Sequence, residues 1–364
     1  MSDHPKVCFI AGTLGMGGAE RQLYYMLKAL TQNNIQCQVL SLTRNETYDA
    51  RIQQLGLRVV WVGRYKNPIL RILRILWEVA KYQPSVIQSA HSFASLYAVL
   101  AGYILRKPSI AAVRSNGVAE FARIGFGGRL VLKLASNVVA NSRTAADAVK
   151  HKYPQKQVFV LDNAIDCEYF CPIELSQSDP IDKIYLLNVG RATSEKRQDL
   201  FLQVVFEVRR MCNNVSARIV GSGPLLPVLR TMTDNMHIHG YVEFLGQQVD
   251  MPAIYQQSAL LVSTSDFEGM PNVIMEAMAC GLPVVATHAG GTTDLIDHGV
   301  NGFVTNCGDV EALVQYVFQL VTDDKLRDLM GLAARQSVVD RYSIDVLYPK
   351  LMQLYETIIT RQVS

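Results

Sequence analysis

The sequence predicts an α/β fold made of two doubly wound domains. Its 364 residues are too many for one core of typical size and suit two domains. Short apolar runs that end in glycine or a polar residue alternate with segments of helical spacing, which is typical of a parallel sheet. The alternation stops at "PIELSQSDPID", residues 172–182, and then starts again. We therefore expect a linker there and one domain on each side.

The first half opens with "KVCFIAG", residues 6–12, a short apolar run that predicts a buried strand. The helix expected after it, over 17–34, places Leu23, Met26, Leu27 and Leu30 on one face. The other strands expected in this half lie at 35–42, 57–63, 84–91, 109–115, 137–142 and 157–164.

The second half repeats the pattern and ends in helices. Its expected strands lie at 183–191, 216–224, 242–247, 259–266, 283–291 and 302–306, and its last helices at 309–323, 324–342 and 343–362. We expect an N-terminal Rossmann-like domain over 1–171, a C-terminal Rossmann-like domain over 172–345 and a last helix over 346–364. The cleft between the domains is the expected ligand site.

Composition excludes several classes of protein. The chain is 49% hydrophobic and 18% charged, which fits a globular protein. It has neither the apolar run of a membrane-spanning helix nor, at its start, the pattern of a signal peptide. The seven cysteines lack paired metal spacing, so we expect reduced cysteines in a cytoplasmic protein. Residues 1–171 carry a net charge of +11 and residues 172–364 one of −8, which predicts an anionic partner for the first half.

The stretch "SDFEGMPNVIMEAMACGLPVVATHAGG", residues 265–291, predicts a well-delimited helix. Pro271 suits its first position, the helix is expected to run from Asn272 to about Cys280, and Gly281 and Pro283 end it. Such an N-terminus binds phosphate. Glu268 before it and Glu276 within it could accept hydrogen bonds from hydroxyl groups, and a nucleotide sugar offers both. The alternative is a capping Glu268 and a solvated or structural Glu276.

Two glycine-containing or basic loops support the same interpretation. "NVGRATSEKRQDL" brings Arg191 and Lys196 to the end of the second domain's first strand, where a diphosphate would need cations. "AGTLGMGGAERQL" places glycines between a strand and a helix. It is a poor dinucleotide fingerprint, because Glu20 stands where the third glycine is expected, and so it disfavours a dehydrogenase.

These motifs, "GGAER", "VGR", "EKR", "GSGP" and "FEGMPNVIMEAMACGLPVVAT", together resemble the retaining glycosyltransferases of family four, glycosyl transferases group 1, which have the GT-B fold. The resemblance covers nearly the whole chain. It implies that 1–171 is the acceptor-side domain, that 172–345 is the nucleotide-sugar donor domain, and that the last helix, 346–364, crosses back to the first domain. It implies transfer of a hexose or N-acetylhexosamine from a nucleotide-diphosphate sugar to a polysaccharide or glycolipid precursor, with retention of anomeric configuration. The leaving phosphate would assist deprotonation of the acceptor. The alternatives are a nucleotide-sugar epimerase of the same fold and a non-catalytic nucleotide-sugar binder.

The resemblance also assigns roles to residues. Glu268 would contact hydroxyls of the donor hexose, Glu276 would bind the ribose, and Arg191 and Lys196 would neutralise the diphosphate. His91 and Asn116 are further candidates for catalysis, although Asn116 stands where many members have a histidine. The remaining donor-binding residues implied are Gly15, Gly17, Gly221, Gly269, Met270, Asn272 and Val273.

The resemblance implies that the enzyme needs no metal and no prosthetic group. It implies a nucleotide-diphosphate sugar as donor, with a UDP-sugar favoured over a GDP-sugar. The expected acceptor is a glycan or lipid-linked molecule. Residues 64–83 and 120–135 mix basic with apolar side chains, so we expect weak attachment of the first domain to anionic membrane. The protein would be cytoplasmic and peripheral on the inner face of the membrane. No nucleic-acid-binding module is recognisable.

Overall fold

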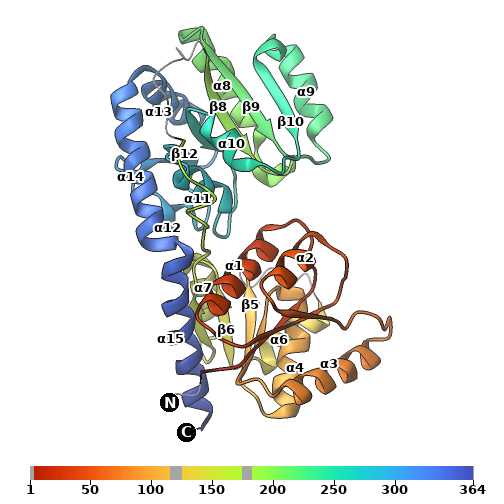
Figure 1. The fold of residues 1–364 in the computed structure, drawn as a ribbon. Coiled ribbons are helices and arrows are strands. Elements are labelled where there is room, and N and C mark those ends of the chain that lie inside the picture. Colours follow the sequence, from red (N-terminus) through yellow and green to blue (C-terminus); the bar gives the residue numbers. More distant parts are fainter. Residues whose placement is uncertain (1–3, 115–124, 174–182, 364) are drawn as a thin grey trace. The chain divides into compact units, whose positions relative to one another are not determined.

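The computed structural model describes residues 4–114, 125–173 and 183–363. The chain forms two compact units, one of residues 1–164 with 344–364 and one of residues 165–343 (Figure 1). Most of the expected linker, 174–182, lies outside the described residues. The predicted roles of the two units, acceptor binding by the first and donor binding by the second, stay predictions.

The first unit has a seven-stranded parallel sheet in the order β3-β2-β1-β4-β5-β6-β7. Its strands are β1 (Val7–Ala11), β2 (Cys37–Ser41), β3 (Arg58–Trp61), β4 (Val86–Ser89), β5 (Ser109–Val113), β6 (Asn137–Ala140) and β7 (Gln157–Val160). Its helices are α1 (Gly18–Gln32), α2 (Thr47–Gln54), α3 (Pro68–Tyr82), α4 (Ser95–Leu105), α6 (Phe126–Leu134), α7 (Arg143–Lys152) and α15 (Ile344–Val363), with a 3₁₀ turn η1 (Ser92–Ala94).

The second unit has a six-stranded parallel sheet in the order β10-β9-β8-β11-β12-β13. Its strands are β8 (Ile184–Val189), β9 (Val215–Val220), β10 (Val242–Gly246), β11 (Leu260–Ser263), β12 (Val284–Thr287) and β13 (Gly302–Thr305). Its helices are α8 (Gln198–Met211), α9 (Leu226–Asn235), α10 (Met251–Gln256), α11 (Asn272–Ala279), α12 (Thr292–Leu295), α13 (Val310–Thr322) and α14 (Asp324–Tyr342), with 3₁₀ turns η2 (Ser194–Lys196) and η3 (His239–Tyr241).

Every strand expected from the sequence is present among the described residues. The reason is visible in β1, β2, β11 and β12, where every residue is buried. A strand covered by helices on both faces of its sheet needs a continuous apolar run, and such runs are easy to recognise. Two doubly wound α/β sheets are therefore confirmed.

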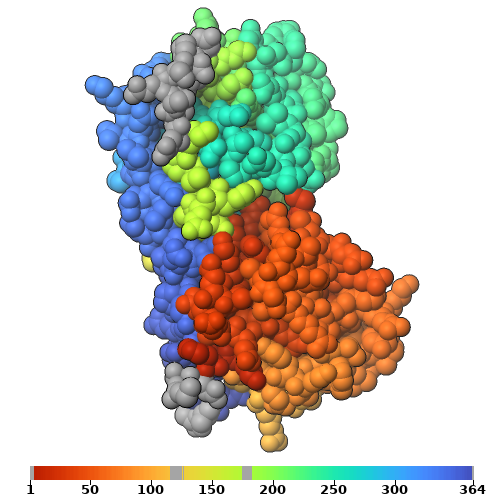
Figure 2. Space-filling view, viewed as in Figure 1, coloured from red at the N-terminus to blue at the C-terminus, as the bar shows by residue number. Residues whose placement is uncertain are grey.

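The last helix, α15, belongs to the first unit and packs on α1. In the space-filling view its blue residues lie against the red N-terminal residues of that unit (Figure 2). Tyr355 of α15 is fully buried, and its hydroxyl donates a 2.6 Å hydrogen bond to Oε1 of Gln88 on β4. Burial raises the pKa of Tyr355 well above its ordinary value, so the phenol stays neutral and donates.

We predict that Tyr355→Phe lowers the free energy of unfolding by about 1–3 kcal/mol, because it leaves the buried Gln88 oxygen without its hydroxyl donor. Urea denaturation measures the change. Tyr348→Phe, at a half-buried position of the same helix, is the matched control and should change stability by about 0.5 kcal/mol or less. Equal effects of the two substitutions would contradict the assignment.

Candidate functional site

The strand order of each sheet creates a topological switch point. In the first sheet it lies between β1 and β4, and in the second between β8 and β11. Chain segments that leave the carboxyl ends of such a pair diverge to opposite faces, which opens a crevice where ligands of doubly wound folds bind. Most of the candidate residues predicted from the sequence follow these four strands.

In the second unit, hydrogen bonds join the loops that follow β8 and β11. The N–H of Asp266 donates to the carbonyl of Glu195 (2.9 Å), and the Thr264 hydroxyl donates to the carbonyl of Arg197 (2.8 Å). Beneath them the Asn188 amide of β8 donates to the carbonyl of Val262 on β11 (2.8 Å). The two loops therefore form one connected support.

Lys196 and Glu268 meet on this support. The Lys196 ammonium donates to Glu268 Oε1 at 2.5 Å, and the Ser265 hydroxyl donates to the same oxygen at 2.7 Å. The two side chains are 21% and 11% exposed, so the pair is sheltered from water. Arg191, by contrast, is 77% exposed and lies 3.7 Å from Glu195 instead of pairing with Glu268. The structure thus brings together two of these three predicted charges.

Glu276 lies within α11 and is buried, and the Tyr255 hydroxyl of α10 donates to its Oε2 at 2.9 Å. Helix α11 starts at Asn272, with Pro271 as its N-cap. The expected run of the helix from Asn272 is confirmed, whereas Pro271 lies one residue outside it, so its prediction as the first helical residue is wrong. Proline carries no capping oxygen, so no N-cap side chain competes for the N–H groups of the first turn.

The C-terminal end of α11 follows the prediction. Gly281 adopts the left-handed conformation, with φ of +80°. The N–H of Gly281 donates to the carbonyl of Met278, and the N–H of Leu282 to that of Ala277, at 2.9 and 3.0 Å. These two bonds form a Schellman motif, which ends the helix before β12.

Two glycines allow backbone segments to approach closely at this edge of the sheet. Gly290 has φ of +54°, and a Cβ there would lie 2.0 Å from the carbonyl oxygen of Glu268. The next N–H, that of Gly291, donates to the carbonyl of Gly269 at 2.9 Å. Gly221, with φ of +131°, packs in the same way on the carbonyl of Gly190. Both glycines are thus needed to shape the loops, whatever else they contact.

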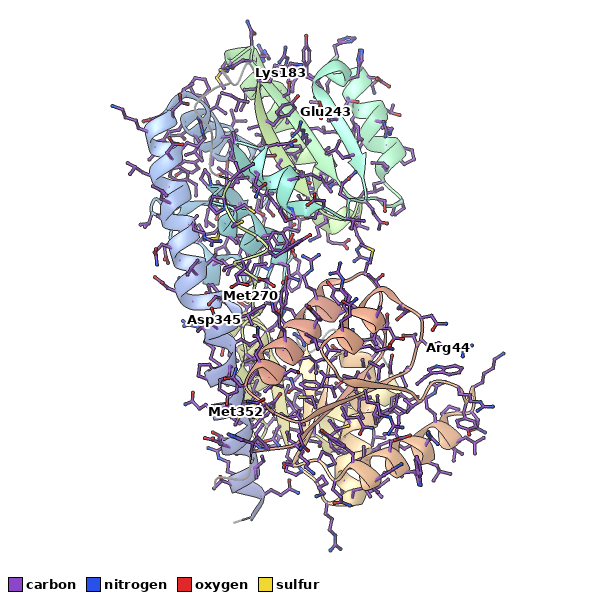
Figure 3. The ribbon with its side chains drawn as sticks, viewed as in Figure 1. Arg44, Lys183, Glu243, Met270, Asp345 and Met352 are labelled. Carbon is purple, nitrogen blue, oxygen red and sulfur yellow. The ribbon has the colours of Figure 1, made fainter. Side chains whose placement is uncertain are left out.

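The other predicted donor-binding residues of this unit surround the start of α11. Gly269 and Met270 belong to the preceding loop, and Asn272 and Val273 are the first two residues of the helix. Met270, labelled in Figure 3, is only 5% exposed. The Met270 residue is therefore part of the buried surroundings of the α11 start.

In the first unit the switch point joins the glycine loop, residues 12–17, to His91 and Glu20. The N–H of Gly12 donates to Nδ1 of His91 at 3.1 Å, and Nε2 of His91 lies 3.2 Å from Oε1 of Glu20. His91 and Glu20 are both buried. Burial alone would raise the pKa of Glu20, but hydrogen bonds from His91 and the backbone outweigh it and lower that pKa. Both ring nitrogens of His91 are therefore engaged inside the unit.

A second carboxylate, Glu46, holds the tip of the glycine loop. Its Oε2 accepts from the hydroxyls of Thr13 (3.1 Å) and Thr43 (2.5 Å) and from the N–H of Leu14 (2.5 Å). Gly15 follows at once, and its N–H donates to the Thr13 hydroxyl. Gly17 is the N-cap of α1 and lies against the Glu20 carboxylate.

One predicted site residue lies outside the described part of the chain, and some residues of the site were not predicted from the sequence. Asn116 lies outside the described residues. Glu46 and Tyr255 were not singled out from the sequence, and Gly290 was only part of a quoted stretch, with no role of its own. Gly290 stands in a Gly-Gly pair after a strand, a signal that could have indicated it. Nothing local indicates Glu46 or Tyr255, because each acts on a segment far away in the chain.

Two features are absent from the described residues. Within them, His, Cys, Asp and Glu form no group of three or more that could hold a metal ion. Across the same ranges, helices lack the length and apolar character that crossing a membrane requires.

Known proteins resemble the chain in both halves. Residues 16–169 match the family described as Glycosyltransferase Family 4, and residues 174–337 match the family described as Glycosyl transferases group 1. The crystal structure of Anabaena HepE in complex with UDP and glucose superimposes with a TM-score of 0.82 at 20% identity, covering 97% of this chain and 100% of that one. At that identity the likeness shows the fold.

Two relatives are more similar in sequence. N-acetyl-alpha-D-glucosaminyl L-malate synthase of Bacillus anthracis is 30% identical over 56% of this chain and 54% of its own length. UDP-Gal:alpha-D-GlcNAc-diphosphoundecaprenol alpha-1,3-galactosyltransferase of Escherichia coli is 28% identical over 55% of this chain and 54% of its own length. The chain thus spans about half the length of these two relatives.

The two sheets and their switch-point loops, together with the structural likeness, show the GT-B fold. The chain belongs to glycosyltransferase family four.

We predict that Gly290→Ala disturbs the Glu268 loop, because the added Cβ would collide with a backbone oxygen and the left-handed conformation is unfavourable. The melting temperature and nucleotide affinity should both fall. Gly308→Ala is the matched control, since Gly308 is also left-handed (φ +81°) but a Cβ there meets nothing within 4 Å. Nucleotide affinity that falls equally in both variants would contradict this role.

A pH prediction follows from Glu46. Burial tends to raise the pKa of this carboxyl, but the hydrogen bonds from Thr43, Leu14 and Thr13 lower it below its ordinary 4.5. A lowered folded-state pKa stabilises the fold above the unfolded pKa, and this contribution is lost as pH falls through the folded value. Glu46→Gln should therefore flatten the loss of stability in urea between about pH 5 and about pH 3. Glu356→Gln, at an exposed position, is the control. If the Glu46→Gln protein lost stability with falling pH as steeply as the Glu356→Gln protein, the prediction would be refuted.

Proposed function

We propose that this protein is a retaining glycosyltransferase that moves a hexose or N-acetylhexosamine from a nucleoside-diphosphate sugar to a polysaccharide or glycolipid precursor. The observation that carries the proposal is the sheltered Lys196–Glu268 pair at the β8/β11 switch point, next to the start of α11. The pair offers a cation for a diphosphate and an acceptor for sugar hydroxyls in one place.

The proposed donor site uses the second unit's loops in turn. Lys196 and the N–H groups at the start of α11 bind the diphosphate, with Arg191 added from the exposed side of the loop. Glu268 accepts from hexose hydroxyls and Glu276 from the ribose. Backbone groups of Gly269, Met270, Asn272 and Val273 complete the contacts, and Gly221 shapes the adjoining loop. From the first unit, Gly15 and Gly17 contribute backbone to donor binding.

The proposed reaction breaks the bond between the anomeric carbon and the diphosphate oxygen. A bond from the same carbon to an acceptor hydroxyl oxygen forms on the same face, and the hydroxyl proton passes to the leaving phosphate. Negative charge grows on the diphosphate as it leaves, so Lys196 and the α11 N-terminus stabilise the transition state more than the ground state. We propose that His91 and Glu20 position the glycine loop during this step, and that Asn116 takes part in substrate binding.

The proposal also covers the nucleoside of the donor, although not its sugar. We favour a UDP-sugar over a GDP-sugar. HepE was crystallised with UDP and glucose, and the Escherichia coli relative is named for UDP-Gal. Both observations support a uridine donor here without identifying its sugar.

We predict that one nucleoside diphosphate raises the melting temperature selectively, and that Glu276→Gln weakens its binding by about 10–100-fold through loss of a charged hydrogen bond to the ribose. A thermal-shift panel of UDP, GDP, ADP and their sugars measures this. Glu311→Gln, which removes an exposed carboxylate from α13, is the matched control. The absence of a shift from every nucleotide in a folded protein would overturn the donor site.

We also propose weak association of the first unit with anionic membrane, through α3. This helix exposes Ile69 (67%), Leu73 (54%) and Trp77 (51%) while Arg74 and Lys81 lie over the Trp77 ring, at 4.5 and 5.2 Å. Apolar side chains beside solvent-exposed cations are the pattern of a helix that lies in a lipid interface.

We predict that the protein floats with vesicles of phosphatidylcholine and phosphatidylglycerol at low salt, and that Leu73→Asp reduces the floating fraction. Leu329→Asp adds the same charge at a position of α14 that is 67% exposed, and should leave flotation unchanged. Equal loss in both variants would mean that net charge, not α3, governs binding.

A further inference from the structure

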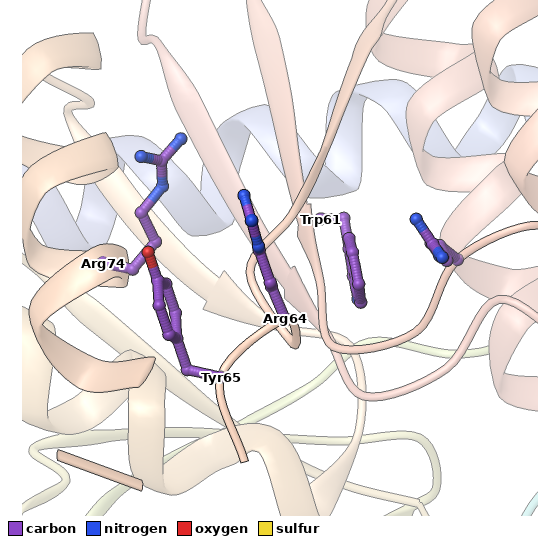
Figure 4. A pocket seen from close by; sticks show the side chains of 5 residues that line it. Trp61, Arg64, Tyr65 and Arg74 are labelled. Atoms are coloured by element: carbon purple, nitrogen blue, oxygen red, sulfur yellow. The ribbon is translucent and has the colours of Figure 1, made fainter. Parts of the chain in front are cut away.

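The first unit has a pocket of about 570 Å³ that the function described so far does not use. We call it the arginine pocket. Its lining residues are Arg44, Trp61, Arg64, Tyr65 and Arg74. Figure 4 shows Arg64 between the rings of Tyr65 and Trp61 in that view. Three guanidinium groups and two aromatic rings thus line it, and the lining contains no carboxylate.

The arginine pocket lies at the same sheet edge as the glycine loop. Trp61 is the last residue of β3, and Arg44 follows the end of β2. Parallel strands end at a common edge, so the pocket is next in line after the loops that follow β1 and β4. Arg44 also stands between Thr43 and Glu46, whose side chains bind each other, and Glu46 in turn binds the glycine loop. Residues 43–46 therefore contribute both to the support of the glycine loop and to the arginine pocket.

The pocket is held in shape by contacts of its own. The Arg44 guanidinium lies over the Trp61 ring at 4.1 Å, which orients its N–H fork without consuming the donors. Arg71 donates to the carbonyl of Tyr65 at 3.0 and 3.2 Å and to the Tyr97 hydroxyl at 2.9 Å, so the loop that carries Arg64 and Tyr65 is fixed.

The charges in the pocket are only partly compensated. Arg74 pairs with the buried Glu78 at 2.5 Å. Arg44 and Arg64 have no carboxylate within 4 Å among the described residues. Two guanidinium forks with free donors suit an anion that carries about two charges and several acceptor oxygens. A phosphoryl group has both properties, whereas a sugar carboxylate has one charge.

We propose that the arginine pocket binds a phosphoryl group of the acceptor. The proposal rests on the proposed function, because it names the acceptor as a phosphorylated or diphosphate-linked glycan precursor. The exposed apolar residues of α3 begin beside the pocket, since Arg74 belongs to both. A phosphate carried on a lipid would therefore find apolar surface next to its binding site.

The two tryptophans of the chain, Trp61 and Trp77, make a direct test available. In Trp77→Phe, fluorescence comes from Trp61 alone and reports on the pocket. We expect inorganic diphosphate to change this emission saturably, and glucuronate to act at least about tenfold more weakly, in line with its single charge. Added to the same background, Arg44→Gln and Arg64→Gln should each weaken diphosphate binding by about tenfold or more.

The control variant is Arg58→Gln, which removes an exposed arginine at the opposite, amino end of β3. It should bind diphosphate as the parent does. No saturable change with diphosphate, or equal weakening by Arg58→Gln and Arg64→Gln, would overturn the proposal. Tighter binding of glucuronate than of diphosphate would overturn it too, because the pocket would then select a carboxylate.

A vesicle arm separates the two sources of the phosphate. Phosphatidylglycerol vesicles that change Trp61 emission and compete with diphosphate would assign the phosphate to a lipid. Diphosphate binding that vesicles leave untouched would assign it to the glycan part of the acceptor. Nucleotide binding, measured by thermal shift in the same variants, should stay at the parental level. If the parent protein bound no nucleotide, the proposed function would be contradicted, but diphosphate binding reported by Trp61 would still be valid.

Discussion

Parallel strands end at a common edge, and the crossovers of a doubly wound sheet diverge at one point along that edge. In this protein both sheets place their first strand beside their fourth, so that β1 ends next to β4 and β8 ends next to β11. The loops that leave these four strands carry Gly12, His91, Lys196 and Glu268. The chemistry available to each unit is thus set by strand order before any single side chain is considered.

Near each switch point, a carboxylate with charged or polar partners connects neighbouring loop segments. In the first unit Glu46 gathers hydroxyl and N–H donors from two loops. In the second, Glu268 joins Lys196 and the Ser265 hydroxyl, while Gly290 lets its backbone be approached closely. A sheltered ion pair brings little net stability on its own, because desolvation offsets much of the attraction. In the proposed donor site, its value is that a cation and an acceptor are already positioned for a ligand that needs both.

The fold could be predicted from the sequence because its signals are local. Buried parallel strands are continuous apolar runs, and the left-handed Gly281 marks the end of α11 without any tertiary information. Glu268, Lys196 and Glu276 were recognised through short motifs, and the structure places the first two in contact. The same could not be done for Glu46 or Tyr255, because their partners Leu14 and Glu276 lie 32 and 21 residues away and are brought near by strand order and helix packing. The position of Pro271 was missed by one residue because helix starts depend on backbone angles that composition does not fix.

The central claim is that a nucleoside diphosphate binds where β8 and β11 end. Hydrogen–deuterium exchange with and without a saturating nucleoside diphosphate tests it most directly, because exchange reports on each backbone segment separately. The account predicts slower exchange in residues 190–197 and 265–276, and unchanged exchange in α9, which is outside the proposed contacts. Protection confined to other segments of the second unit, with these two loops unaffected in the presence of bound nucleotide, would contradict it.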